Sequence, residues 1–139
     1  MIKYKVGDIL KCNNNIAHCV SRDIRMSAGL ARKMRFQFGG IKEMKRLKRD
    51  VGDIVVIKRN GHAIIGLITK KYFWKKPLYS DIESSLLKLK SYLIDTNQRS
   101  IAMPLIACGL DGKDWNIIER MITNIFEKNF EITIYKLPK

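Results

Sequence analysis

Apolar residues in the first half of the chain recur at strand and helix spacings in turn. Before residue 50 this pattern predicts strands at residues 4–10 and Ile16–Ser21 and helices at residues 30–38, which Gly39-Gly40 ends, and 41–47. Two β-branched runs, residues 53–58 and 63–69, then flank Asn60-Gly61, which is typical of a two-residue turn. We therefore expect these two runs to pair as an antiparallel hairpin.

The second half of the chain continues the alternation of strands and helices. Ser80-Asp-Ile-Glu83 matches a capping box and is expected to begin a helix, whose apolar stripe consists of Ile82, Leu86, Leu89 and Leu93. Further elements are predicted as a buried strand at Ser100–Pro104, a helix capped by Asp114 with Ile118, Met121, Ile122 and Ile125 inward, and a strand at residues 131–135. This order predicts an α/β fold with a mixed sheet and helices on both of its faces.

The composition favours one folded domain over residues 1–139. Hydrophobic residues make up 46% of the 139 positions, which excludes a disordered basic tail. No apolar stretch approaches the roughly 20 residues that a membrane span needs, so we expect a cytoplasmic protein with no membrane partner. Cys12, Cys19 and Cys108 show no ligand spacing, so reduced thiols, no metal and no cofactor are expected. We also expect a monomer.

The formal net charge is +14, and most of it lies in the first half of the chain. Residues 1–70 hold 16 basic and 5 acidic side chains, and the densest basic segment is residues 32–49. Such a field attracts polyanions, and nucleic-acid contact through this segment is one interpretation. A solvated, lysine-rich helix face explains the segment equally well.

Two loops connect a predicted strand to a helix and contain small residues. They are residues 21–29 and residues 105–112, called below the 21–29 loop and the 105–112 loop. In α/β sheets ligands bind where loops leave the carboxyl ends of strands, and small residues let backbone N–H groups approach an anion such as a diphosphate. Neither loop matches a Gly-x-Gly-x-x-Gly or Walker pattern, so ordinary connections remain the alternative.

The order of several short motifs over essentially the whole chain resembles the macrodomains, in particular the branch of the terminal ADP-ribose protein glycohydrolases. These motifs are Val6-Gly-Asp-Ile9, Ala17-His-Cys-Val-Ser21, Arg25-Met-Ser-Ala-Gly29, Phe38-Gly-Gly40, Leu67-Ile-Thr-Lys-Lys71, Met103-Pro104, Cys108-Gly-Leu-Asp111 and Ile132-Thr-Ile-Tyr-Lys-Leu137. The resemblance implies a three-layer α/β/α sandwich with a mixed central β-sheet and a cleft for ADP-ribose.

The resemblance also implies which residues contact ADP-ribose. Asp8 and the Ile9 backbone would hold the adenine with Tyr135 nearby, and the two loops would enclose the diphosphate and distal ribose. The implied contacts are Asp8, Ile9, Ser21, Met26, Ser27, Ala28, Gly29, Leu30, Pro104, Ala107, Cys108, Gly109, Leu110 and Tyr135. Ala107 and Ser27 stand where the family commonly has glycine, so the two loops depart from the family pattern around the diphosphate.

Lys70 and Asp111 are the residues expected to carry the chemistry. A lysine amine can attack the anomeric carbon of a ribose esterified to a carboxylate and form a covalent adduct, and a carboxylate can move the protons. Neighbouring cations and partial burial should disfavour the ammonium form of Lys70. A plain ion pair between the two is the alternative. His18 is expected to be a buried histidine with its hydrogen bonds satisfied.

Three functions are consistent with these residues. The first is a metal-independent hydrolase that removes mono-ADP-ribose from Glu or Asp esters on proteins, with related activity on O-acetyl-ADP-ribose or ADP-ribose-1″-phosphate. The second is a non-catalytic reader of ADP-ribose or poly(ADP-ribose), because a fold alone does not establish activity. The third is a hydrolase acting on ADP-ribosylated nucleic acid. The expected partners are therefore ADP-ribose and ADP-ribosylated proteins.

Overall fold

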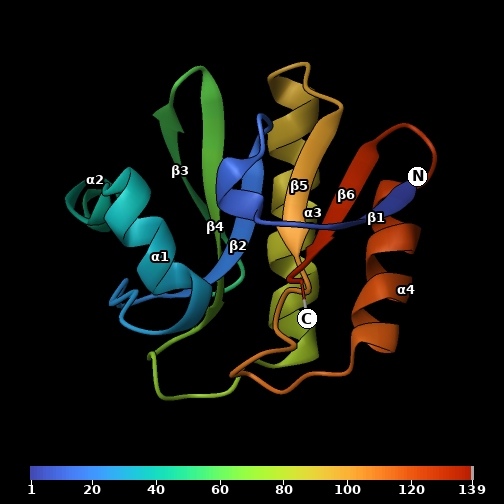
Figure 1. The fold of residues 1–139 in the computed structure, drawn as a ribbon. Helices are drawn as coiled ribbons and strands as arrows, with labels where there is room; N and C mark the ends of the chain where they lie inside the picture. The colour runs from blue at the N-terminus through green and yellow to red at the C-terminus, as the bar shows by residue number, and fades with distance from the viewer. Residues whose placement is uncertain (139) are drawn as a thin grey trace.

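The computed structural model describes residues 1–138 and shows a six-stranded sheet between two layers of helices (Figure 1). The strands are β1 (Ile2–Val6), β2 (Ile16–Ser21), β3 (Ile54–Arg59), β4 (His62–Lys70), β5 (Ser100–Pro104) and β6 (Glu131–Lys136). The helices are α1 (Gly29–Phe38), α2 (Ile41–Arg46), α3 (Tyr79–Asp95) and α4 (Trp115–Phe126), with a 3-10 turn at Ile9–Lys11. The predicted α/β sandwich with a mixed sheet is confirmed.

The strand order is β1-β6-β5-β2-β4-β3. β1, β6, β5, β2 and β4 run parallel to one another, and β3 is antiparallel to β4, with which it forms the predicted hairpin. Asn60 and Gly61 at its tip both have positive φ, of 52° and 80°, as the expected turn requires. All five parallel strands therefore present their carboxyl ends at one edge of the sheet.

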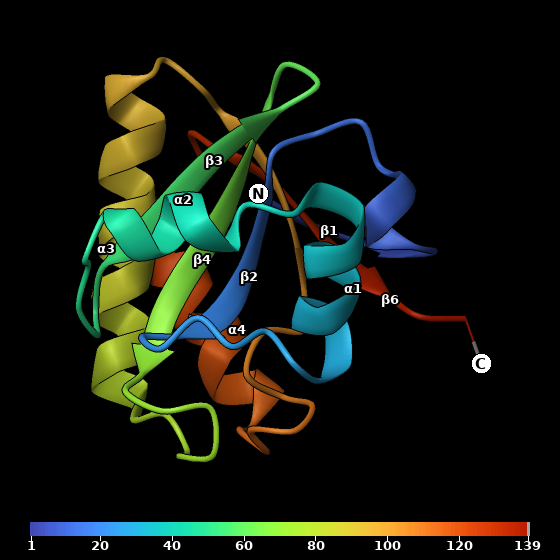
Figure 2. The ribbon, with the colours of Figure 1, turned by 90° about the vertical axis from the view of Figure 1, so that its left-hand side faces the viewer.

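Each face of the sheet is covered by its own pair of helices. Figure 2 shows α1 and α2 in front of one face, and α3 and α4 lie on the other. β4 illustrates the consequence, because Ile65 and Leu67 pack toward α3 while Ile64 and Ile68 pack toward α1 and α2. A strand buried on both faces has no polar side, which explains the continuous apolar run from residue 63 onward. No helix within residues 1–138 is long and apolar enough to cross a membrane.

Two predicted boundaries are wrong. The strand expected at residues 4–10 is β1 and ends at Val6, because its partner β6 ends opposite it and Asp8 then caps the 3-10 turn. The helix expected to follow a Ser80 cap has Leu78 as its cap and begins at Tyr79, two residues earlier than expected. The backbone N–H groups of Asp81 and Ile82 both donate to the Leu78 carbonyl at 3.1 Å, so Ser80 lies inside the first turn.

Candidate functional site

The carboxyl ends of the parallel strands place the predicted site residues in a row. Along the strand order, the row runs from Asp8 after β1, through Tyr135 on β6, Pro104 on β5 and Ser21 on β2, to Lys70 on β4. Four inter-strand spacings of about 4.8 Å make this row roughly 19 Å long. The loops that follow β2, β4 and β5 gather along the lower edge of the sheet in Figure 1. The edge is therefore long enough to bind an extended ligand of roughly 19 Å along its whole length.

Two adjoining cavities lie along this edge. The smaller, of about 590 Å³, lies at the β1–β6 end, and the larger, of about 760 Å³, extends to the β4 end. They share the lining residues Gly29, Leu30, Pro104, Tyr135 and Leu137, so together they form one elongated groove. All of the residues that the sequence analysis assigned to catalysis or ligand binding line one cavity or both. Their individual roles stay predictions.

Asp8, Ile9 and Tyr135 line the smaller cavity. Oδ1 of Asp8 accepts a hydrogen bond of 3.0 Å from the Leu10 backbone N–H, so the carboxylate caps the short turn. Its second oxygen is free of that role, and the side chain is exposed toward the groove. Ile9 is 4% exposed and anchors the turn in the core. The carboxylate can therefore accept a hydrogen bond from an amino group in the cavity.

The 21–29 loop has an unusual backbone. Ile24, Met26 and Gly29 all have positive φ, of 49°, 47° and 59°, and the side chains of Ile24 and Met26 are buried. A non-glycine residue in this region is strained, and such strain persists where the surroundings impose it. The loop delivers the chain to α1, whose cap Ala28 supplies no side-chain hydrogen bond. The first N–H groups of α1 are thus presented to the cavity, as in anion sites at helix N-termini.

The 105–112 loop faces the 21–29 loop across the groove. Ala107, at the position where the family commonly has glycine, has a φ of +60° and so adopts the left-handed conformation in spite of its methyl group. Its carbonyl accepts a hydrogen bond of 2.8 Å from the Lys113 N–H, which closes the loop. A Cβ on Gly29 would lie 3.4 Å from Cδ1 of Leu110, so the two loops are almost in contact there.

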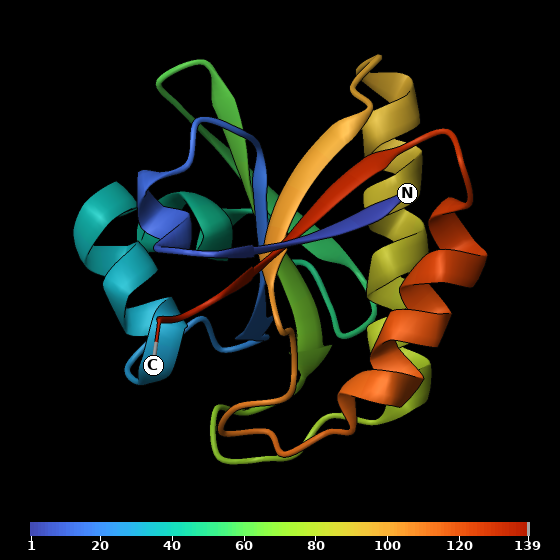
Figure 3. The same ribbon diagram turned by 45° about the vertical axis from the view of Figure 1, so that its right-hand side comes forward.

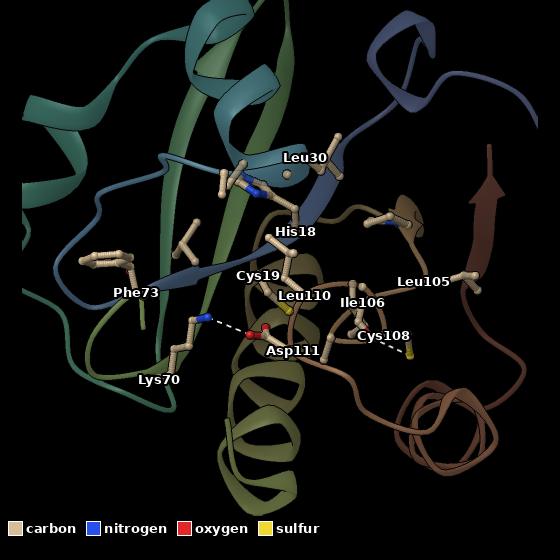
Figure 4. A pocket seen from close by; sticks show the side chains of 18 of the residues that line it. His18, Cys19, Leu30, Lys70, Phe73, Leu105, Ile106, Cys108, Leu110 and Asp111 are labelled. Atoms are coloured by element: carbon tan, nitrogen blue, oxygen red, sulfur yellow. Dashed lines mark hydrogen bonds and ion pairs between the residues drawn. The ribbon is translucent and has the colours of Figure 1, made fainter. Parts of the chain in front are cut away.

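Lys70 and Asp111 face one another at the β4 end of the groove (Figure 4). Nζ of Lys70 lies 2.7 Å from Oδ1 of Asp111, and the two side chains are 15% and 12% exposed. The pairing of β2 and β4 shifts after Val20, so that Ser21 pairs with Lys70 rather than with Thr69. Such a bulge redirects a side chain at the end of a strand. The structure thus brings together a primary amine and a carboxylate at the rim of a cavity.

His18 is buried, as predicted, but the prediction that its hydrogen bonds are satisfied is wrong. His18 is 1% exposed, but neither ring nitrogen has a hydrogen-bond partner among residues 1–138. His18 pairs in register with Gly66, and its ring lies in the apolar floor of the cavity (Figure 4). Burial lowers the pKa of His18 to about 4, so the ring is neutral at neutral pH.

The cysteines near the site are poor nucleophiles. Burial, reinforced by the nearby Asp111 carboxylate, raises the pKa of Cys19 to about 12. Burial also raises the pKa of Cys108, whose thiol donates to the Ile106 carbonyl. Within residues 1–138, no three His, Cys, Asp or Glu side chains gather closely enough to hold a metal ion. The amine of Lys70 is therefore the nucleophile that the site presents most directly.

The structure adds residues that the sequence analysis did not assign to the site. Phe73, Trp74, Lys75 and Lys76, which follow Lys70 along the chain, also line the larger cavity. Their signal in the sequence is the run of aromatic and basic residues directly after the strand, which a search for family motifs passes over. Two residues of the 21–29 loop contact this run: Asp23 accepts from the Phe73 backbone N–H, and Arg25 lies over the Phe73 ring.

The basic segment 32–49 lies on α1, on α2 and in the connection after α2, away from the Lys70 end of the groove (Figure 2). Arg32 and Lys33 line the smaller cavity. Glu43 pairs with Arg59 at 2.6 Å, and Arg49 pairs with Asp53 at 3.5 Å. Most of the segment's other cations are exposed on the outer surface of these helices. The structure is compatible with either interpretation of this segment.

No model of a known protein family matches the sequence. The human ADP-ribose glycohydrolase OARD1 is 38% identical to the chain over 139 residues, which cover 98% of this chain and 91% of the relative. The macrodomain of Thermus aquaticus DarG superposes with a TM-score of 0.88 at 20% identity and 98% coverage of both chains. Thermosipho africanus DarTG in complex with ADP-ribose gives a TM-score of 0.81 at 21% identity, covering 97% of this chain and 41% of that chain.

The likeness to the two solved structures shows the fold, and the likeness to the human enzyme extends over nearly the whole length of both sequences. The chain therefore belongs to the macrodomain family, in the branch of the terminal ADP-ribose protein glycohydrolases.

Proposed function

We propose that this protein is an ADP-ribosyl hydrolase that releases mono-ADP-ribose from ester-linked Glu and Asp acceptors on proteins. The observation that carries the proposal is the Lys70–Asp111 pair, 2.7 Å apart at one end of a groove whose other end presents the Asp8 carboxylate. Membership of a family of ADP-ribose glycohydrolases supports the reaction class. The same chemistry extends to O-acetyl-ADP-ribose and ADP-ribose-1″-phosphate.

The groove accounts for each part of ADP-ribose in turn. The adenine amino group would donate to Asp8 with Ile9 and Tyr135 around the ring. The diphosphate would lie between the first N–H groups of α1 and the 105–112 loop, where backbone donors and small residues favour an anion. The distal ribose then reaches Lys70. A solved neighbour of this fold, DarTG of Thermosipho africanus, is in complex with ADP-ribose, which supports ADP-ribose as the ligand.

The reaction begins from the ion pair. Asp111 accepts a proton from the Lys70 ammonium and so frees the lone pair on Nζ. Nζ then bonds to the anomeric carbon while the bond from that carbon to the ester oxygen breaks, and the acceptor carboxylate leaves with the electron pair. Water next displaces the amine from the sugar and releases ADP-ribose, and its spare proton passes to solvent. Asp111 returns its proton to Lys70, which restores the pair.

Turnover of a glutamate-linked mono-ADP-ribosylated protein tests the proposal. The wild-type protein should release ADP-ribose, and Lys70→Ala and Asp111→Ala should each lose nearly all of the rate. Lys88→Ala, an exposed lysine of α3, is the matched control. The adduct at Lys70 can open its sugar ring, the nitrogen proton passing to the ring oxygen, to give an imine. Borohydride added during turnover should reduce this imine and leave ADP-ribose covalently attached to Lys70, identified by mass spectrometry. Equal rates in wild type and Lys70→Ala would contradict the assignment.

The non-catalytic reader is distinguished by the same material. A reader would bind ADP-ribose in calorimetry with no release from any ester-linked substrate and no adduct. The retained amine and carboxylate at 2.7 Å favour the hydrolase, because a reader has no need of a nucleophile at the end of the groove.

A further inference from the structure

Ser21 and Asp23 form a contact at the reactive end of the groove that the mechanism above does not use. Ser21 ends β2, is 5% exposed and lines the larger cavity. Its hydroxyl donates a hydrogen bond to Oδ1 of Asp23, which is the one side-chain partner of Ser21 among residues 1–138. Asp23 is half-buried and lines neither of the two cavities. Asp23 can therefore influence a bound ligand through Ser21.

The backbone holds Ser21 beside Lys70. The two residues pair in register at the ends of β2 and β4, which are neighbouring strands of the sheet. The Arg22 N–H donates to the Lys70 carbonyl at 2.8 Å, and the Ile24 N–H donates to the Ser21 carbonyl at 3.0 Å. Paired residues of neighbouring strands have their backbones only about 4.8 Å apart. The Ser21 hydroxyl thus lies at the same end of the groove as the amine that is expected to react.

Both carboxylate oxygens of Asp23 have a donor. Oδ1 accepts from the Ser21 hydroxyl, and Oδ2 accepts from the Phe73 backbone N–H at 3.5 Å. A carboxylate has no proton to donate, and a serine hydroxyl has only one. The proton of Ser21 is therefore committed to Asp23, and only the lone pairs of Oγ remain for the cavity. Ser21 consequently presents a ligand with a hydrogen-bond acceptor and no donor.

An acceptor at this position suits a ligand hydroxyl and disfavours a phosphate oxygen, which has no proton to donate. The neutral donors of ADP-ribose are the adenine amino group, assigned above to Asp8, and the ribose hydroxyls. Of these hydroxyls, the 2″-hydroxyl is attached to the carbon next to the anomeric carbon that Lys70 would attack. Hydrogen bonds to this hydroxyl strengthen in a transition state that carries positive charge on the sugar.

We propose that Asp23 is a positioning residue that orients the Ser21 hydroxyl, so that Oγ of Ser21 accepts a hydrogen bond from the 2″-hydroxyl of the distal ribose. The inference rests on the proposed function for the placement of that ribose beside Lys70. No proton is transferred along this chain of hydrogen bonds. Its effect is to hold the sugar and to stabilise the positive charge that develops as the acceptor leaves.

Calorimetry with ADP-ribose and its 2″-fluoro-2″-deoxy analogue tests the proposal without turnover, because fluorine replaces the hydroxyl but brings no proton. The wild-type protein should bind ADP-ribose about tenfold more tightly than the analogue. In Asp23→Asn the amide oxygen has to face the Phe73 N–H, so its NH2 group faces Ser21 and turns the Ser21 proton toward the cavity. The preference for ADP-ribose should then fall to about twofold or less. Ser21→Ala should lose the preference as well, and it keeps the test decisive should Asp23→Asn not fold.

Turnover of glutamate-linked mono-ADP-ribosylated protein gives the second measurement. Asp23→Asn should lower kcat about tenfold and change KM less than about twofold, since the hydrogen bond is strongest in the transition state. The double variant of Ser21→Ala and Asp23→Asn should be no slower than Ser21→Ala alone, because Asp23 acts through Ser21. Asp50→Asn is the matched control, since Asp50 pairs with Arg22 of the same loop at 3.3 Å but lines neither cavity.

Equal affinity of the wild-type protein for the two ligands would overturn the proposal. The same preference in wild type and Asp23→Asn would also overturn it, as would a double variant slower than Ser21→Ala. A protein that shows the expected preference but releases no ADP-ribose would contradict the proposed hydrolase and still support the role of Ser21 and Asp23. The two proposals can therefore fail separately.

Discussion

The ion pair between Lys70 and Asp111 should contribute to the free energy of unfolding as well as to the reaction. Removing one partner of a fully buried pair costs about 3–5 kcal/mol, whereas an exposed pair contributes at most about 1 kcal/mol. The two side chains retain 15% and 12% of their exposure, which places this pair between those limits. Lys70→Met leaves the carboxylate unpaired, and we expect it to lower the free energy of unfolding by about 2 kcal/mol.

Asp111→Asn should cost less, about 1 kcal/mol, because the amide oxygen still accepts a hydrogen bond from the ammonium. The double variant leaves neither charge, so its loss should fall short of the sum of the two single losses by about 1 kcal/mol. Urea unfolding followed by circular dichroism measures all three. A loss of about 2 kcal/mol corresponds to a fall of roughly 7 °C in Tm for a chain of this length.

Lys88→Met is the control, because Lys88 is an exposed residue of α3 whose replacement should change stability by less than about 0.5 kcal/mol. The reasoning is refuted if the two single losses simply add in the double variant, since the charges would then not interact. It is equally refuted if Lys70→Met is as stable as the control. Turnover of the same variants is a separate measurement and does not enter this comparison.

Three further changes probe other parts of the groove. Lowering the pH from about 7.5 to about 5 should lower the free energy of unfolding by about 2 kcal/mol. A histidine in the unfolded chain has a pKa near 6.5, whereas the pKa of His18 in the folded protein is about 4, so protons bind preferentially to the unfolded chain in this range. The loss, followed by urea unfolding at the two pH values, should vanish in His18→Leu. Gly66→Ala should lower stability by about 1–3 kcal/mol, since its Cβ would lie 2.8 Å from Val55 and 2.9 Å from Val20; a melting curve that coincides with wild type would contradict this. Asp8→Asn keeps the cap but loses the charge, so calorimetry should show ADP-ribose affinity reduced about tenfold with Tm unchanged; unaltered affinity would make Asp8 a cap only.

Local signals in the sequence predict a large part of the fold. Asn60-Gly61 fixes the hairpin, and Asp114 caps α4 by accepting a hydrogen bond of 2.9 Å from the Asn116 N–H, as expected. Both signals act within a few residues, so the rest of the chain has little power to override them. The Ser80 cap failed because Leu78, with an extended backbone, already caps the helix: its carbonyl accepts from the Asp81 and Ile82 N–H groups, two residues before the expected cap.

Sequence motifs predict which residues belong to the site, but only the strand order shows how close together they lie. The resemblance supplied Lys70 and Asp111, whose separation of 41 residues in the chain gives no distance between them. The strand order brings them to 2.7 Å and places Asp8 at the far end of the same edge. The missing partners of His18 depend on packing between distant segments, which no local pattern records. Phe73 and Trp74 stand in a visible run of aromatic and basic residues, but only the fold places that run at the cavity.

The pairing of β1 with β6 determines when the Asp8 end of the groove can form during folding. Ile2 lies opposite Ile132, and the N-terminal amine donates to the Phe130 carbonyl at 2.5 Å (Figure 3). During synthesis, the hairpin that ends in Lys70 can form while β6 is still unmade, whereas the Asp8 end has to wait for it. A nucleotide lying along the whole edge would then fasten the earliest and latest parts of the chain together, which shifts the folding equilibrium by mass action. A destabilising substitution in β6 should accordingly weaken binding of the nucleoside part of the ligand while leaving the Lys70 amine and the Asp111 carboxylate in place.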